Sequence, residues 1–147
     1  MTTEATVLVR DDGFHAEDWT ARITALGDLA ANDDAAEIAI DLASDDDPAG
    51  LTDRLGQIAL IRVDFPSFAD GRGFTIARSL RDAGYTGRLR AAGHVIADQY
   101  AMARRAGFDE VEISADLAAR QPQDQWLARA NWRAHDYQSR LRTAAFS

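Results

Sequence analysis

Nine residues in the middle of the chain have the types and spacing of a binding site for a small anion: Asp64, Asp70, Gly71, Arg72, Gly73, Arg90, Gly93, His94 and Asp98. Arginine guanidinium groups form paired hydrogen bonds with oxyanions, so Arg72 and Arg90 would supply the attractive charge. Gly71 and Gly73 let the backbone approach a ligand closely. A helix predicted to follow this loop would direct free N–H groups at the same place. We therefore expect the loop Asp70-Gly-Arg-Gly73 to bind an anion or another small ligand.

The same loop has two other interpretations. Its glycines can serve turn geometry alone, with Asp70 capping the next helix and pairing with Arg72. Residues 71–77 also have the G-x-G-x-x-x-A outline of a dinucleotide-binding loop, with Arg90 imitating an arginine that selects NADP. However, such a fingerprint puts its glycines directly after the first strand, and here residues 65–70 intervene. A nicotinamide or flavin therefore stays an alternative, and the sequence identifies no cofactor.

His94 has a side chain suited to acid or base catalysis near neutral pH. Its one candidate partner is Asp98, one helical turn further along. The alternative is that His94 only precedes a helix predicted from Val95 to Ala106. The three histidines are too scattered for a metal-binding pair, and the acidic run Ser44-Asp-Asp-Asp-Pro48 lacks the spacing and glycine of a calcium loop. We therefore assign no catalytic residue and expect no metal site.

Alternating strand and helix patterns position these residues. Apolar periodicity and terminating glycines predict strands and helices in the order β-α-β-α-β, over residues 58–64, 75–83, 88–91, 95–106 and 110–113. This order is typical of a parallel sheet with crossover helices. Ligands of such sheets bind beyond the carboxyl ends of the strands, which is where Asp64, Arg90 and His94 fall.

One helix–strand joint occurs twice. Arg81-Asp-Ala-Gly-Tyr85 ends the first predicted helix, and Arg104-Arg-Ala-Gly-Phe108 ends the second. In each copy the glycine suits the left-handed position after a helix, and the cations suit its last turn. The aromatic residue can pack back on the helix. The repeat supports successive βα units.

The remaining segments complete one α/β domain over residues 1–147. We expect an N-terminal hairpin, a weakly helical stretch, a strand, a short helix and a C-terminal helix, over residues 6–19, 19–29, 37–42, 51–55 and 123–141 respectively. A full eight-fold barrel needs about 250 residues. The mostly parallel sheet is therefore either half-barrel-like or open.

The amino-acid composition limits the classes of molecule that the protein is expected to bind. The net charge is −8 and all 16 basic residues are arginine, so we expect no nucleic-acid partner. There is no cysteine, which removes thiol chemistry and disulfides and fits a cytoplasmic protein. No apolar run approaches the ~20 residues of a membrane span, so we expect no membrane association. A homo-oligomer is compatible with these features.

A longer string resembles a known family. It comprises Phe65-Pro-x-Phe-x-Asp-Gly-Arg-Gly73, Ala77-Arg78, Gly84-Tyr85-x-Gly87-x-Leu89-Arg90-Ala91-x-Gly93, Asp98-Gln99 and Gly107-Phe108-Asp109. It is similar to a bacterial domain-of-unknown-function family whose members are often labelled as oxidoreductases involved in sulfite reduction. Their genes lie beside those for sulfite reductase and other steps of sulfur assimilation. The match is strongest over residues 58–113.

The resemblance implies an accessory protein of assimilatory sulfite reduction. Such a protein would bind sulfite reductase, its electron donor or a small anion. An oxidoreductase with a borrowed nicotinamide or flavin is one alternative, and a small-molecule enzyme or anion sensor is another. Family members usually carry Asp where His94 stands, and often Cys where Ala106 stands. The first difference leaves a catalytic role of this position in doubt, and the second argues against a thiol mechanism shared by the family.

Overall fold

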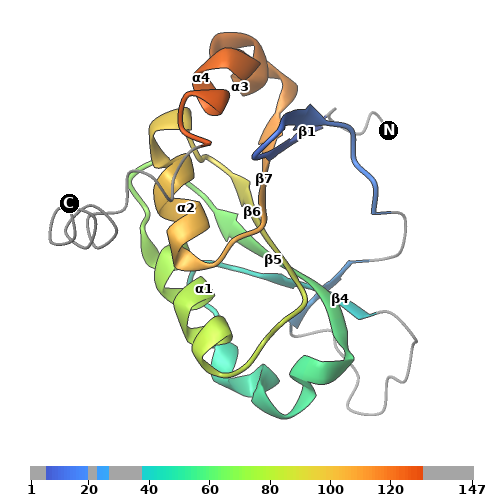
Figure 1. Cartoon of the computed structure of the whole chain (residues 1–147). Coiled ribbons are helices and arrows are strands. Elements are labelled where there is room, and N and C mark those ends of the chain that lie inside the picture. The colour runs from blue at the N-terminus through green and yellow to red at the C-terminus, as the bar shows by residue number, and fades with distance from the viewer. Residues whose placement is uncertain (1–5, 20–22, 27–37, 131–147) are drawn as a thin grey trace, which may run out of the picture.

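The computed structural model describes residues 6–19, 23–26 and 38–130 (Figure 1). Its strands are β1 (Thr6–Arg10), β2 (Gly13–His15), β3 (Thr24–Ala25), β4 (Ile38–Leu42), β5 (Ile58–Phe65), β6 (Arg88–Gly93) and β7 (Glu110–Ser114). They form one sheet in the order β2-β1-β7-β6-β5-β4-β3. β3 to β7 are parallel, whereas β1 is antiparallel both to β7 and to its hairpin partner β2. This open sheet confirms the α/β class and the N-terminal hairpin.

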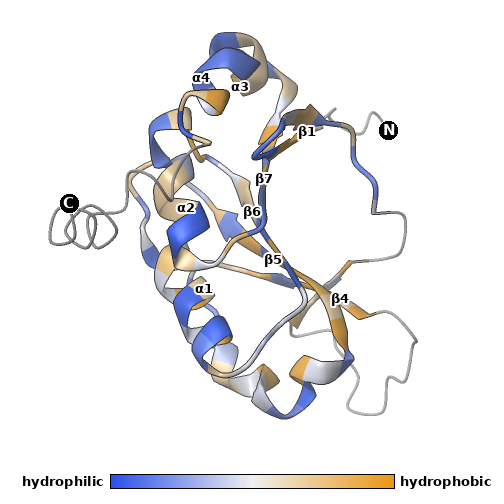
Figure 2. Ribbon diagram, in the orientation of Figure 1, coloured by the Kyte–Doolittle hydropathy of each residue, from blue (hydrophilic) through white to orange (hydrophobic). Residues whose placement is uncertain are grey.

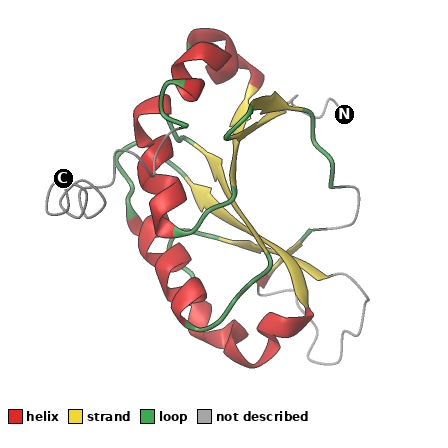
Figure 3. Cartoon of the chain, in the orientation of Figure 1, coloured by secondary structure: helices red, strands yellow, loops and turns green. Residues whose placement is uncertain are grey.

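Helices connect the parallel strands from β4 onward. The helical elements are the 3-10 helix η2 (Pro48–Gln57), α1 (Arg72–Asp82), the 3-10 turn η3 (Ala97–Gln99), α2 (Tyr100–Ala106), α3 (Ala115–Arg120) and α4 (Gln123–Leu127). α1 and α2 lie on the same side of the strands (Figure 3). The chain therefore has a helical layer on one sheet face, and the other face is left for different contacts.

Alternation along the strands explains why the helices cover one face. Val63 and Phe65 of β5 belong to the hydrophobic core, whereas Arg62 and Asp64, which alternate with them, do not. The Phe65 ring lies 5.0 Å from the ring of Phe74 on α1, centroid to centroid. Full burial of one such side chain contributes about 1.5–3 kcal/mol. Figure 2 shows hydrophobic residues along β4 and β5 and mixed polarity along α1, as expected for a helix with one buried side.

The two predicted helix–strand joints have the same geometry. Gly84 and Gly107 both have positive φ, at 103° and 120°. The amide of Tyr85 donates to the Leu80 carbonyl, and the amide of Phe108 donates to the Ala103 carbonyl. These are the bonds of a Schellman motif, which satisfies carbonyls left over at a helix end. The repeated sequence pattern is thus confirmed as a repeated structure.

Three predicted elements differ from the structure. α2 begins at Tyr100 instead of Val95, and the 3-10 turn η3 precedes it. The side chains of Gln99 and Gln121 accept the amides of Ile96 and Ala97 in this turn. Within the weakly helical stretch predicted over residues 19–29, Thr24–Ala25 forms a strand, and residues 20–22 and 27–29 lie outside the described part. The C-terminal helix begins at Gln123 as predicted, but α4 ends at Leu127 and residues 131–141 lie outside the described part.

The sheet face away from α1 and α2 carries one connected set of ion pairs. Charged residues alternate with core residues along β5, β6 and β7. Each consecutive pair in the following series is bonded, and we call the series the ion-pair row: Asp41, Arg62, Glu112, Arg90, Glu110 and Arg88. After β2 the chain adds Glu17 on Arg90 and Asp18 on Arg88. The charges on this face are therefore largely compensated within the protein.

Candidate functional site

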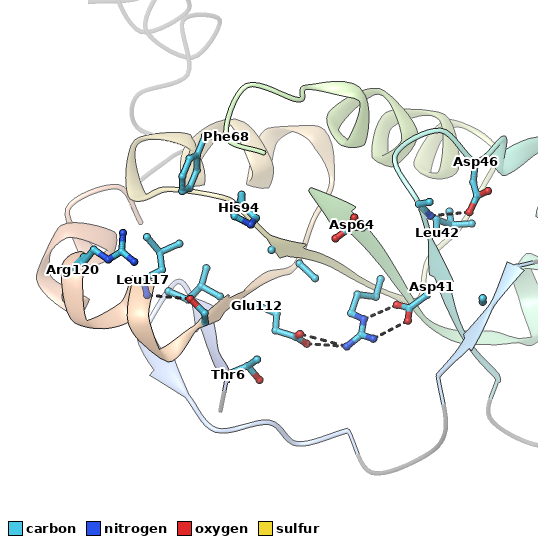
Figure 4. A pocket seen from close by; sticks show the side chains of 17 residues that line it. Thr6, Asp41, Leu42, Asp46, Asp64, Phe68, His94, Glu112, Leu117 and Arg120 are labelled. Carbon is cyan, nitrogen blue, oxygen red and sulfur yellow. Dashed lines mark hydrogen bonds and ion pairs between the residues drawn. The ribbon is translucent and has the colours of Figure 1, made fainter. Parts of the chain in front are cut away.

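A cleft of about 630 Å³ opens at the carboxyl ends of the parallel strands. Its walls come from Asp64 of β5, Gly93 of β6 with His94 after it, and Ser114 of β7. Phe68, Leu117 and Arg120 complete the rim (Figure 4). Clefts of about 300–1,000 Å³ in this position commonly bind small molecules. The structure therefore brings three of the nine predicted residues, Asp64, Gly93 and His94, to one cleft.

Backbone geometry fixes the β6 side of the cleft. Gly93 has φ at 115°, and a Cβ atom added to it would lie 2.7 Å from the Phe65 carbonyl oxygen. The next amide, of His94, donates to that same carbonyl at 2.9 Å. The His94 ring then meets the Phe68 ring edge to face, with centroids 5.2 Å apart. Glycine is required here by chain packing, and His94 is held at the rim as a result.

The floor of the cleft is the end of the ion-pair row. Arg62 donates from Nε and Nη2 to the two carboxylate oxygens of Asp41, at 2.6 and 2.8 Å. Its Nη1 reaches Glu112 over longer distances of 3.3 and 3.4 Å. The hydrogen bond with Asp41 outweighs burial and raises the pKa of Arg62. Arg62 is therefore a fixed cation whose charge two carboxylates already balance.

Three charged or polar side chains at the rim differ from Arg62 in having no ion pair among the described residues. In the described part of the chain, the side chains of Asp64, His94 and Arg120 show no hydrogen bond or ion pair. All three are exposed. A ligand in the cleft would thus meet a carboxylate, an imidazole and a guanidinium without first breaking an internal ion pair. This combination suits a ligand that has both an acidic group and a hydrogen-bond donor.

The nine predicted site residues do not include Arg120, Ser114 and Thr6, which also line the cleft. Arg120 ends α3, whose start is fixed by Ser114, since its Oγ accepts the Leu117 amide at 3.1 Å. Thr6 lies at the cleft because β1 pairs with β7, which places Thr6 opposite Ser114. A Ser followed by a helical stretch after the last strand was a sequence signal for the cap. The antiparallel return of β1 had no such local signal.

The loop Asp70-Gly-Arg-Gly73 lies elsewhere and is internally paired. Asp70 accepts the backbone amide of Arg72 at 3.1 Å and its guanidinium at 2.6 Å. Hydrogen bonding by Arg72 holds the pKa of Asp70 well below its usual range. Arg72 also donates to Ser44 at 2.9 Å. This carboxylate lies where an anion at the start of α1 would bind, as the alternative interpretation of the loop expected.

One of the two glycines of that loop, Gly73, has a packing role. A Cβ atom on Gly73 would lie 2.4 Å from the Phe65 ring, so the glycine lets α1 approach β5. Gly71 precedes α1 without a side-chain cap. The predicted dinucleotide outline requires glycines directly after the strand. Neither glycine lines the cleft, so the geometry gives no support to that outline.

Arg90 and Asp98 do not join the cleft either. Arg90 is fully buried and donates to Glu110 at 2.6 Å, to Glu17 at 2.7 Å and to Glu112 at 2.6 Å. The expected convergence with Arg72 does not occur, because Arg90 is held by Glu110 whereas Arg72 pairs with Asp70 and Ser44. Asp98 pairs with Arg129 at 2.8 Å, and so does not serve as the partner of His94.

Comparison with known proteins identifies a family. A model described as "bacterial protein of unknown function (DUF934)" matches residues 39–146. The chain belongs to this family. The DUF934 match extends beyond the stretch 58–113 on which the sequence resemblance is strongest. No curated protein and no solved structure matches the chain.

The DUF934 match covers β4 to α4 and therefore most of the cleft. Within the described part of the chain, no three His, Asp or Glu side chains are grouped so as to hold a metal ion. None of the helices in that part is long and apolar enough to cross a membrane. What the cleft can do chemically is to accept and donate hydrogen bonds around a small acidic ligand.

Proposed function

We propose that this protein is an accessory protein of assimilatory sulfite reduction that binds a small acidic ligand in the strand-end cleft. The observation that carries the binding step is the convergence of Asp64, His94 and Arg120 on one cleft. These residues come from β5, from the end of β6 and from α3. We also propose that the protein is cytoplasmic and that it binds sulfite reductase or its electron donor.

Each rim residue has a separate task in this proposal. Arg120 donates paired hydrogen bonds to the acidic group of the ligand, as a guanidinium does to any oxyanion. His94 adds a donor or an acceptor, depending on its protonation. Asp64 accepts from a hydroxyl or amine and rejects ligands that carry only negative charge. Arg62 supports the floor but stays bound to Asp41 and Glu112.

The sulfur-assimilation context rests on the motif resemblance around residues 65–73 and 84–93. The binding step rests on the cleft, which is independent of that resemblance. The cleft also replaces the loop around Arg72 as the proposed binding place, since Asp70 already pairs with that arginine. Partner binding and ligand binding are compatible, because the rim of the cleft is exposed.

Deletion and complementation test the proposal. A strain without the gene should grow poorly on sulfate or sulfite as sulfur source and normally on cysteine. The intact gene should restore growth, whereas Arg120→Gln and Asp64→Asn should restore it poorly. Arg105→Gln is the matched control, because Arg105 is exposed on α2 and does not line the cleft. All variants should accumulate to equal levels by immunoblot.

Two results would contradict the proposal in different ways. Normal growth of the deletion strain on all three sulfur sources would remove the pathway assignment. Full complementation by both cleft variants, in a strain that does require the gene, would remove the cleft from the function.

A further inference from the structure

We infer that the ligand of the cleft is an organic anion with a planar ring, of about mononucleotide size, whose ring lies on Phe68 and whose acidic group binds Arg120. This inference rests on the proposed function and specifies the ligand class. It uses three observations: the volume of the cleft, an exposed aromatic side chain held at its rim, and the separation of charge between Asp64 and Arg120.

The volume decides against an inorganic oxyanion as the whole ligand. The cleft holds about 630 Å³. One water molecule takes roughly 30 Å³ of liquid volume, and a tetrahedral oxyanion only a few times more. A small oxyanion would leave most of the cleft to water and could reach only one part of the rim. A ligand that contacts several walls must be an organic molecule.

Phe68 provides the surface for a ring. It is the most exposed large hydrophobic side chain in the described part of the chain, at 45 %. Two hydrogen bonds hold the loop that carries Phe68. The Phe68 carbonyl accepts from Gln99 Nε2 at 2.9 Å, and the Asp70 amide donates to the Ser67 carbonyl at 3.1 Å. The His94 ring supports Phe68 from one side. A fixed aromatic at a cleft wall is a platform for stacking another ring.

The charged groups define the other two ends of the ligand. Figure 4 shows Arg120 near Leu117, Phe68 near His94, and Asp64 on the far side of His94. Arg120 therefore suits a phosphate, sulfonate or carboxylate group. Asp64 suits hydroxyl or amino hydrogens, since an ionised carboxylate only accepts hydrogen bonds. A ring, an acidic group and a hydrogen-bond donor occur together in nucleoside monophosphates.

Calorimetry and thermal unfolding of the full chain test the inference with defined probes. AMP and FMN contain a ring and a phosphate, adenosine lacks the phosphate, and inorganic phosphate and sulfite lack the ring. We expect AMP or FMN to bind at least tenfold more tightly than adenosine, phosphate or sulfite, and to raise the melting temperature. Phe68→Ala and Arg120→Gln should each weaken that binding by about tenfold.

Matched controls separate the cleft from general surface effects. Met102→Ala removes a side chain that is 44 % exposed on α2 and does not line the cleft. Arg105→Gln removes an exposed cation on the same helix. Neither control should change the affinity for AMP or FMN. A uniform loss in all four variants would show non-specific binding and overturn the inference.

Two further results would also overturn it. If sulfite or phosphate binds as tightly as AMP and FMN, and Phe68→Ala has no effect, the ligand needs no ring, while the proposed anion-binding function survives. If neither AMP nor FMN binds at millimolar concentration, a nucleotide-like ligand is excluded. The complementation phenotypes of Arg120→Gln and Asp64→Asn then still decide the proposed function.

Discussion

Arg90 Nε donates to Glu110 Oε2 at 2.6 Å, and the two side chains are 0 % and 3 % exposed. This is a buried ion pair on the sheet face away from α1 and α2. Arg90 also binds Glu17 and Glu112. Burial raises the pKa of Glu17, but hydrogen bonds from Arg90 and from the Trp19 amide outweigh it and lower the pKa overall. Glu17 therefore stays ionised near neutral pH.

We predict that Arg90→Ala destabilises the protein by about 3–5 kcal/mol. The reason is that Glu110 and Glu112 would lose the fully buried cation that bridges them. Arg10 and Arg88 would still contact Glu110, and Arg62 would still contact Glu112, but these three arginines are partly exposed. Urea unfolding followed by circular dichroism measures the loss. Arg105→Ala is the control and should change the free energy of unfolding by less than about 0.5 kcal/mol, because Arg105 is exposed. Similar values for both variants would contradict a structural role of the row.

We predict that His94→Asp changes stability by less than about 0.5 kcal/mol. An aspartate would stabilise a helix that began at Val95, but η3 begins at Ala97 and its preceding amides are satisfied by Gln99 and Gln121. The comparison is Ser114→Ala, which removes the observed cap of α3 and should cost about 0.5–2 kcal/mol. If His94→Asp instead raised the free energy of unfolding by about 0.5–2 kcal/mol, as a new helix cap does, the helix would have to start earlier.

We predict that the two joint glycines respond unequally to alanine. Both have positive φ, which costs a side-chain-bearing residue about 1–2 kcal/mol. A Cβ atom on Gly84 meets nothing within 4 Å, whereas one on Gly107 would lie 2.6 Å from Arg81 Cγ. Gly107→Ala must also disturb the two hydrogen bonds from Arg81 to the Gly107 carbonyl. Urea unfolding should show the larger loss in Gly107→Ala; equal losses would refute the contact argument.

We predict a loss of stability in acid that depends on Asp18. Burial opposes ionisation of this residue, but hydrogen bonds from Arg10 and Arg88 outweigh burial and lower its pKa from 3.8 to about 2. A pKa lowered by folding means a contribution that is complete above pH 3.8 and lost as the pH falls towards 2. Asp18→Asn should therefore flatten the decline of unfolding free energy in this window. Asp116→Asn is the control at an exposed position and should leave this decline of unfolding free energy unchanged.

The local structure could be predicted from the amino-acid sequence. β5, α1, β6 and β7 lie within a few residues of their predicted positions, and both glycine joints have the expected φ. α1 and the two joints depend on hydrogen bonds between residues at most five apart, such as Tyr85 to Leu80, and the strands were recognisable from their apolar patterns. Such bonds require only the residues nearby, so the amino-acid pattern is sufficient. The pairing of Asp70 with Arg72 is local in the same way and was one of the predicted interpretations.

Which charged residues reach the cleft could not be predicted, because it depends on how the strands and helices pack. A strand turns successive side chains to opposite faces, so Arg90 faces Glu110 and Glu17 instead of the strand end. The alternation in Arg88-Leu-Arg90 and Glu110-Val-Glu112 was visible in the sequence, but its partners on other strands were not. Asp64 and Arg120 meet at one cleft because the order of β5, β6 and β7 and the start of α3 place them there. That order depends on contacts between distant segments, which no local spacing encodes.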